Sequence, residues 1–269
     1  MTVTVDDTNL KAIADAIRAK NGTEETYKPS EMAAAIEAIE TNNYDKLIGK
    51  GIKEISSNIV SVGVYSFYNC TNLTSADFPK AITLEDYAFY ATSALVDINF
   101  PLVRTVGRYT FRGSGFSNAY FPSVTSIGAT SFGYNTALTS ANFPKLTETA
   151  GSAFASCPSL VSVDLPKATT IATYSFEKCY SLKAVILRKE TVCTLDNTSA
   201  FTGCYHFLGT VDSTYNPNGS KDGYIYVPSA LINTYKTASN WSNYASQFRA
   251  LESYTVDGTI TGALDESKI

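Results

Sequence analysis

The chain has 269 residues, of which 44% are hydrophobic and 17% are charged, and its formal net charge is −4. A chain of this length can bury a sizeable core, whereas its acidic balance argues against a nucleic-acid partner, which favours a basic face. No window reaches the roughly 18 apolar residues that a membrane span needs. The start, MTVTVDDTNL, is polar and acidic, so we expect no secretory signal there.

Residues 1–40 have the pattern of a helical hairpin. Apolar side chains at helical spacing predict two helices, with Leu10, Ile13 and Ile17 in the first and Met32, Ile36 and Ile39 in the second. Two interpretations stay open for this segment. It is either an end cap that covers the first coil of the next region, or an arm for attachment or oligomerisation.

The same segment, LKAIADAIRAKNGTEETYKPSEMAAAIEAI, resembles the N-terminal part of tail-associated proteins in phages and prophages of Gram-positive bacteria. The resemblance covers about thirty residues. It implies an arm that docks on a virion or holds protomers together as a homo-oligomer.

Residues 41–208 are expected to form one solenoid, in which residues 62–187 repeat one pattern six times, and each copy is anchored by a phenylalanine. The intervals between anchors are 22, 22, 21, 22 and 22 residues, which is the signature of a repeat protein. Residues 41–61, with Ile52, Ile55 and Ile59, are expected to form a degenerate first coil, and the copy around Phe201 a distorted last one. The six anchors are Phe67, Phe89, Phe111, Phe132, Phe154 and Phe176.

Each copy also predicts one short strand. In the first copy Ala76 and Phe78 alternate with polar residues, and this period of two indicates a strand with one buried face. Pro79 ends the strand because proline has no amide hydrogen for the ladder. Since one coil cannot bury its own apolar edge, the coils must stack. The predicted fold is therefore a repeat solenoid with a parallel β ladder.

Leu73, Ala76 and Phe78 match the first apolar places of a leucine-rich repeat, and Ala81 stands where such repeats usually carry Asn or Cys. This departure, with the anchor Phe after a small residue and the strand exit FPK-x-x-T, resembles the BspA-like class of bacterial leucine-rich repeats. The resemblance covers about half of the chain. It implies a curved solenoid that binds at cell or virion surfaces, and it does not imply an enzyme.

Residues 209–252 are expected to form an α/β C-terminal cap, and residues 253–269 a loose polar tail. Tyr224 to Val227 predicts a strand, Ser229 caps a following helix, and Trp241 plugs the core. The order IYVPSALINTYKTASNWSNYASQF resembles the cap that follows BspA-like repeats.

The segment GTVDSTYNPNGSKDG at 209–223 is interpreted as a solvated turn. Its oxygens offer calcium ligands, although their spacing does not match an EF-hand loop. These oxygens belong to Asp212, Asn216, Asn218 and Asp222.

The five cysteines are interpreted as buried free thiols that fill small apolar gaps. Cys157, Cys179 and Cys204 each lie three residues after a Phe and would stack, so a disulfide or a metal site there is the alternative. We expect neither a metal nor a cofactor. The single histidine, His206, is expected to have a structural or surface role, because no catalytic motif accompanies it.

Two surfaces are candidates for ligand binding. The first is the outward side of the strands, a polar strip that could instead only solvate the ladder. The second is a ridge just after the anchors, where exposed tyrosines and an arginine are typical interface residues. The strip contains Asp77, Asn99, Tyr120, Asn142, Asp164, Asp97 and Asn118, and the ridge contains Tyr68, Tyr90, Arg112 and Tyr134.

Together these features predict a non-enzymatic recognition or adhesion module of a phage or prophage tail, located on a virion or an extracellular surface. Its partner would be a protein or glycan on a cell surface. The alternative is a bacterial cell-surface adhesin that binds a host protein or glycan. A glycan-processing enzyme is the third class considered, and it would need a cleft carboxylate.

Overall fold

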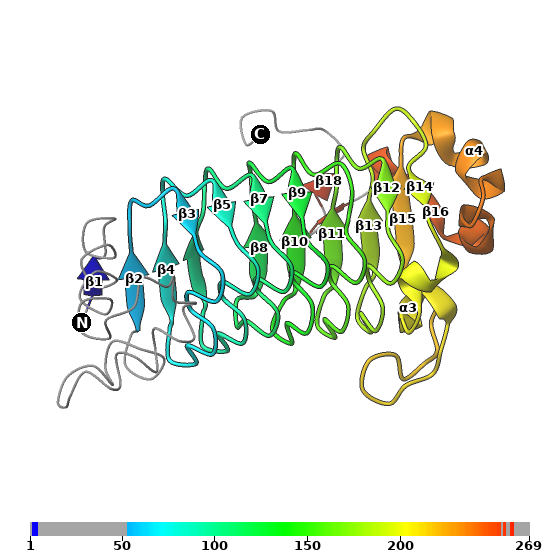
Figure 1. The fold of residues 1–269 in the computed structure, drawn as a ribbon. Helices are drawn as coiled ribbons and strands as arrows, with labels where there is room; N and C mark the ends of the chain where they lie inside the picture. The colour runs from blue at the N-terminus through cyan, green and yellow to red at the C-terminus, as the bar shows by residue number, and fades with distance from the viewer. Residues whose placement is uncertain (1, 5–52, 254, 257–258, 261–269) are drawn as a thin grey trace.

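Stacked coils form the body of the protein, and they run from β2 (Glu54–Ser56) at one end to β15 (Tyr224–Val227), β16 (Phe248–Ala250) and a group of helices at the other (Figure 1). The computed structural model describes residues 2–4, 53–253, 255–256 and 259–260. The predicted N-terminal helices and Ile52 lie outside these residues. Within them, the repeat solenoid expected from the sequence is confirmed.

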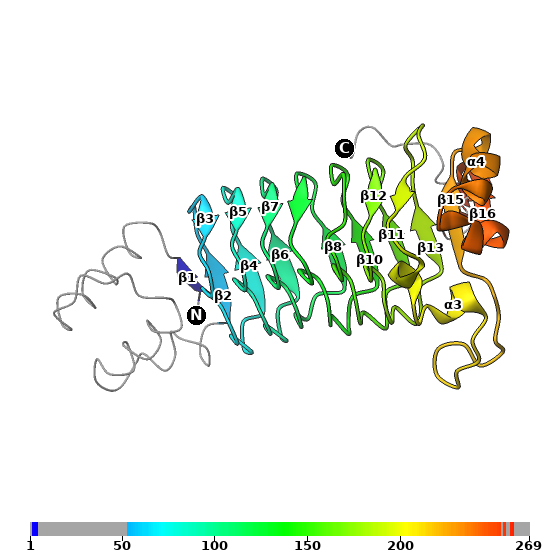
Figure 2. The same ribbon diagram turned by 45° about the vertical axis from the view of Figure 1, so that its right-hand side comes forward.

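A parallel ladder of short strands runs along one side of the coils (Figure 2). Its register joins equivalent residues of successive coils, so Ala76 lies opposite Ile98 and Ala141 opposite Val163. The strands from β4 to β13 fall where the alternating pattern of the six copies predicts them, whereas β1 and β16 were not predicted. The strands of this ladder are β1 (Thr2–Thr4), β2 (Glu54–Ser56), β4 (Ser75–Asp77), β6 (Asp97–Asn99), β8 (Asn118–Tyr120), β10 (Ser140–Asn142), β11 (Ser162–Asp164), β13 (Ala184–Ile186), β15 (Tyr224–Val227) and β16 (Phe248–Ala250).

A second parallel ladder, which the sequence analysis did not predict, contains one two-residue strand in most coils. In the six anchored coils its buried residue lies five positions before the anchor, where apolar side chains recur, and in the last strand Leu195 lies six positions before Phe201. Thr149 replaces the apolar residue in one coil, and its Oγ accepts from the Ala172 amide at 2.9 Å. The strands are β3 (Ser61–Val62), β5 (Thr83–Leu84), β7 (Thr105–Val106), β9 (Ser126–Ile127), β12 (Thr170–Ile171) and β14 (Thr194–Leu195).

Two columns of phenylalanine rings fill the core between the ladders. The anchor rings stack from coil to coil, with centroids 5.3 Å apart for Phe89 and Phe111 and 5.6 Å apart for Phe154 and Phe176. A second column from the strand ends packs edge-on against the first, as Phe143 does on Phe132 at 5.1 Å. Offset and edge-to-face rings at these distances are favourable beyond their buried area. The predicted stacking of the anchors is confirmed.

The coil anchored by Phe111 is one residue shorter than its neighbours, and the first ladder divides beside it. Phe116 lies five positions after its anchor, whereas Leu138 lies six after Phe132. In the described sheets β6 ends one sheet and β8 begins the next. The short coil lies so close to the preceding one that a Cβ on Gly115 would come within 2.2 Å of the Ser93 carbonyl oxygen.

The coil that contains Phe201 has an insertion before its strand. After Phe201 and α3 (Tyr205–Leu208), residues 209–223 leave the coil, and β15 then pairs in register with β13. The strand predicted from Tyr224 to Val227 is therefore confirmed, and it extends the ladder past residue 208.

Short helices close the C-terminal end (Figure 1). Trp241 is 1% exposed and donates its indole N–H to the Cys193 carbonyl at 2.6 Å, which confirms the predicted plug. The predicted cap by Ser229 is wrong, because no side chain caps that helix and the Ser229 hydroxyl faces Glu252. The helices are η2 (Thr198–Phe201), η3 (Ser229–Leu231), α4 (Ile232–Thr237), η4 (Trp241–Gln247) and η5 (Leu251–Ser253).

The tail is not wholly without structure. β17 (Thr255–Val256) pairs with β18 (Thr259–Ile260) in an antiparallel arrangement. The expectation of a loose tail is wrong for these four residues.

Candidate functional site

Two columns of tyrosines lie on the turns around the anchors, and we call them together the aromatic ridge. The first column, two residues before the anchors, stacks Tyr65 on Tyr87 and Tyr87 on Tyr109, each pair with centroids 4.9 Å apart. The second stacks Tyr68 on Tyr90 at 4.8 Å. Only the second column was predicted from the sequence, although a tyrosine also recurs at 22-residue intervals in the first.

Arg112 continues the second column in place of a tyrosine. Its guanidinium donates to the Tyr90 hydroxyl, and its Cζ lies 3.9 Å from the centroid of the Tyr134 ring. This cation–π contact and the hydrogen bond hold the guanidinium between two rings. The four ridge residues predicted from the sequence are thus brought together.

Four of the ridge tyrosines have a left-handed backbone conformation. Tyr65, Tyr87 and Tyr109 have φ between 57° and 60°, and Tyr134 has φ of 60°. The positions two residues before and after the anchors are left-handed in other coils too, where Thr130 and Ser156 occupy them. The left-handed conformation is therefore a property of the coil. The coil does not require a tyrosine at these positions. Glycine or asparagine would suit these positions at lower conformational cost.

A shallow hollow of about 400 Å³ lies where the first column ends. Tyr109 is its last ring, because the small side chain of Thr130 stands at the equivalent place in the next coil. The hollow is therefore open beside Tyr109. It is lined by Tyr87, Tyr90, Tyr109, Arg112, Thr130 and Tyr134.

The ridge combines neutral phenols with positive charge. Burial, together with the neighbouring Tyr109 and Tyr65, raises the pKa of Tyr87, so its hydroxyl stays protonated. Arg108 lies with its Cζ 5.9 Å from the centroid of the Tyr109 ring. Among the described residues, neither Arg108 nor Arg112 has a carboxylate within ion-pair distance.

The polar strip lies on the outer side of the first ladder, but several of its side chains bond to one another. Asn99 donates to Asp77 at 2.7 Å, and Ser56 donates to the same carboxylate at 3.0 Å. Arg188 donates to both carboxylate oxygens of Asp164, with a shortest distance of 2.8 Å. These contacts satisfy two of the strip's carboxylates within the protein.

The other strip residues differ in exposure. Tyr120 is 46% exposed, Asp97 and Asn118 are exposed, and Asn142 is half-buried. Towards the C-terminal end the strip ends, because Ile186 at the equivalent strand position is buried. The strip is therefore shorter than the ladder that carries it.

The cysteines are buried and free, as predicted. Cys157 donates its thiol to the Phe132 carbonyl at 3.2 Å, and Cys204 donates to the Phe176 carbonyl at 3.1 Å. Burial raises the pKa of the Cys204 thiol far above its usual value, and that of Cys193 to about 12. Within the described part of the chain no cluster of His, Cys, Asp and Glu has a metal-binding arrangement.

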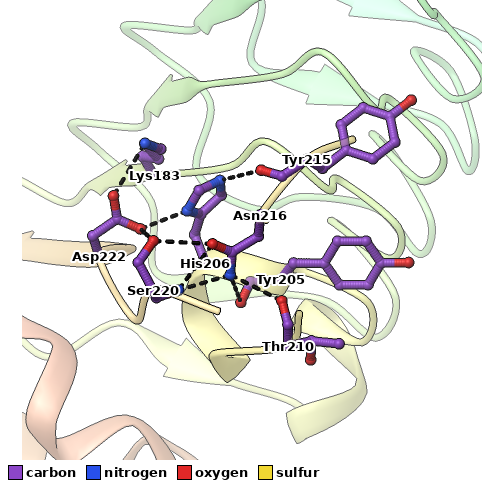
Figure 3. A network of polar contacts seen from close by, with 8 residues as sticks. All are labelled: Lys183, Tyr205, His206, Thr210, Tyr215, Asn216, Ser220 and Asp222. Atoms are coloured by element: carbon purple, nitrogen blue, oxygen red, sulfur yellow. Dashed lines mark hydrogen bonds and ion pairs between the residues drawn. The ribbon is translucent and has the colours of Figure 1, made fainter. Parts of the chain in front are cut away.

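His206 ties the inserted loop to the solenoid (Figure 3). The ring is 5% exposed, its Nε2 lies 3.0 Å from the Tyr215 carbonyl oxygen, and its Nδ1 contacts the Asp222 carboxylate. Lys183 from the preceding coil pairs with the same carboxylate at 3.0 Å. Both ring nitrogens thus face acceptors, and the arrangement leaves neither to act as a base on a ligand.

Asn216 makes the loop a built structure rather than the solvated turn that was predicted. It is buried, its amide donates to the carbonyls of Thr210 and Ser220 at 2.9 Å each, and its oxygen accepts from the Ser220 amide (Figure 3). The prediction is wrong for Asn216, because these contacts replace water. Asp212 accepts from two backbone amides as in an Asx turn.

None of the helices in the described ranges has the length and apolar character needed to cross a bilayer.

Comparison with known proteins identifies the repeat. Residues 34–116 and 104–214 match the BspA type leucine rich repeat region, in six copies. A search among curated proteins found no match.

Three solved structures with similar coils are distant from this chain. A leucine-rich repeat protein from Bacteroides ovatus has 20% identity and a TM-score of 0.33, over 73% of this chain and 57% of that one. A leucine-rich repeat protein from Eubacterium ventriosum has 24% identity and a TM-score of 0.36, over 67% of this chain and 40% of that one. A leucine rich cell surface protein from Faecalibacterium prausnitzii has 15% identity and a TM-score of 0.26, over 73% of this chain and 76% of that one. The chain spans about half the length of the first two, and these values are too low to transfer a function.

Proposed function

Because the chain belongs to the BspA type leucine-rich repeat family, we propose that it is a non-enzymatic binding protein whose recognition surface is the aromatic ridge. The observation that carries this proposal is the pair of tyrosine columns with Arg112 held between Tyr90 and Tyr134. The first column and Tyr134 occupy left-handed positions, where a tyrosine costs stability. A surface feature retained at such a cost is better explained by binding than by folding.

Physical chemistry favours the ridge as an anchor for a protein partner. Tyrosine and arginine are, with tryptophan, the residues that most often dominate binding energy at interfaces. Stacking on neighbours fixes the rings before a partner arrives, which lowers the entropy lost on binding. The polar strip is the weaker candidate, because Asp77 and Asp164 already have partners within the protein.

In the fuller proposal the solenoid, residues 41–208 with the cap 209–252, is presented by the arm at 1–40, and 253–269 follow as a tail. The arm's resemblance to phage and prophage tail proteins supports a role on a virion, with the partner on a cell surface. The alternative is a bacterial cell-surface adhesin for a host protein or glycan. Its support is that the family match covers residues 34–214, whereas the resemblance to tail proteins rests on the arm alone.

A displayed library of random peptides tests the recognition surface without knowledge of the partner. Peptides selected on the full chain should bind a strip variant, Tyr120→Ser, and lose binding to the ridge variants Tyr68→Ser and Tyr134→Ser. All three residues are exposed, so folding is spared. Binding that is lost only in Tyr120→Ser, or a selection that retains no peptide, would overturn the ridge as the recognition surface.

A further inference from the structure

The hollow beside Tyr109 carries a positive charge that the described residues leave without a counter-ion. Arg112 lines this hollow and spends one N–H on the Tyr90 hydroxyl. A guanidinium has five N–H donors in a planar fork. By contrast, the fork of Arg188 is taken up by both oxygens of Asp164.

The surroundings of Arg112 define what could complete its fork. The Tyr134 ring covers one face of the guanidinium at 3.9 Å, so a new partner approaches in the plane of the fork. Planar, two-pronged acceptors are carboxylates, and they pair with arginine through two parallel hydrogen bonds. The second cation, Arg108, lies against Tyr109 on the same edge of the coils and adds to the attraction.

We propose that the hollow is a carboxylate-binding site that reads a Glu or Asp side chain of a peptide segment in a partner protein, with Arg112 as the residue that pairs with it. The site rests on the proposed function, since it lies within the aromatic ridge. A peptide is favoured over a glycan because stacking covers both faces of Tyr87 and one face of Tyr109. Sugar rings need free aromatic faces, whereas a peptide uses the edges and hydroxyls that the columns expose.

The probe is an acetylated decapeptide of alternating Glu and Gly, titrated into the full chain while the arginine Nε–H signals are followed by NMR. We expect the Arg112 signal to shift and the Arg188 signal to stay, because Arg188 is already paired. The matched peptide of Gln and Gly should leave both signals unchanged. An uncharged peptide that shifts Arg112 equally would overturn the proposal.

Variants separate the fork from general charge. Arg112→Gln and Arg112→Lys should both lower the affinity for the Glu peptide about tenfold or more. Lysine offers a point charge without the fork. Arg104→Gln removes the same charge from an exposed residue outside the hollow and should change affinity less than about twofold. Equal losses in Arg104→Gln and Arg112→Gln would overturn the site.

Two further outcomes separate this inference from the proposed function. Hyaluronan oligosaccharides, which carry uronate carboxylates, should not shift Arg112; if they do and the Glu peptide does not, the peptide assignment is overturned. If library peptides lose binding in Tyr68→Ser and Tyr134→Ser but bind Arg112→Gln normally, the ridge remains the recognition surface and only the carboxylate site fails.

Discussion

At the residue scale, aromatic side chains serve two separate tasks in each coil. The anchor phenylalanines are enclosed by rings of the neighbouring coils, whereas the tyrosines beside them stack at the surface and are half-buried or exposed. The distinction is visible in the sequence because a phenol carries a polar end that favours contact with water. It lets substitutions separate stability from binding.

Phe111→Ala tests the stacked core. Phe111 is fully buried between Phe89 and Phe132, so its removal should lower the free energy of unfolding by about 3–5 kcal/mol. The control is Phe67→Ala, because Phe67 is only half-buried at the end of the column and should cost less. Chemical denaturation measures both, and an equal or smaller loss at Phe111 would contradict the stacked core.

Asp222 predicts an acid-sensitive contact between the loop and the solenoid. Burial alone would raise its pKa, but hydrogen bonds from His206, Lys183 and Ser220 outweigh this and hold the pKa well below the ordinary 3.8. A carboxyl with a lowered folded-state pKa stabilises the fold fully above its unfolded pKa, and the stabilisation is lost as pH falls through the folded value.

Denaturation of the wild type and Asp222→Asn, from about pH 5 to about pH 2, checks this expectation. The stability difference between the two proteins should be constant at the upper end and narrow as pH falls below 3.8. A difference that does not depend on pH would show that Asp222 contributes no titrating contact. Sequence alone could not reveal this contact, because the residues that meet at Asp222 belong to three separate segments.

At the scale of elements, the strands were predictable and the turns were not. Alternation of buried and polar residues, with a proline at the exit, located the first ladder because few structures besides a half-buried strand produce that pattern. The left-handed turn positions carry no such signal, since Tyr87, Ala91 and Thr130 occupy them where glycine would be expected. The second ladder was missed because two-residue strands are too short to alternate.

Ala91→Gly tests the turn geometry. Ala91 has φ of 56°, which an L-residue adopts at a cost of about 1–2 kcal/mol and glycine adopts freely, so the substitution should stabilise the protein by about 1 kcal/mol. Ala129 is a half-buried turn alanine without positive φ among the described residues, and Ala129→Gly should destabilise by about 0.5–1 kcal/mol. Thermal unfolding of the two variants should move in opposite directions; shifts of the same sign would refute the left-handed turn.

At the scale of the whole molecule, the repeat makes the protein a row of near-equivalent coils on which a few coils are specialised. The repeat and its fold followed from the sequence because one pattern recurs at a fixed interval. The proposed recognition surface did not follow from the sequence, because the pairing of Asp77 with Asn99 and of Asp164 with Arg188 is visible only in the structure. The hollow lies where a column of stacked tyrosines ends. Its position could therefore be found only once the stacking of the coils was known.

Assembly through the arm is tested by light scattering of the full chain. If the arm holds protomers together, the mass at high micromolar concentration should be that of two or more chains of 29.0 kDa each. Ile13→Asp with Ile17→Asp would place charges on the predicted apolar stripe of residues 1–40 and should return the protein to monomer mass. A full chain that is monomeric at that concentration would contradict assembly through the arm.

Amide hydrogen exchange of the full chain, with and without a saturating library-selected peptide, tests the recognition surface most directly. Binding at the aromatic ridge should slow exchange in the turns at 65–69, 87–91, 109–113 and 130–134, where the two tyrosine columns lie. Exchange in the strands of the polar strip, at 97–99 and 118–120, should not change. Slowed exchange in those strands, with the turns unchanged, would contradict the account.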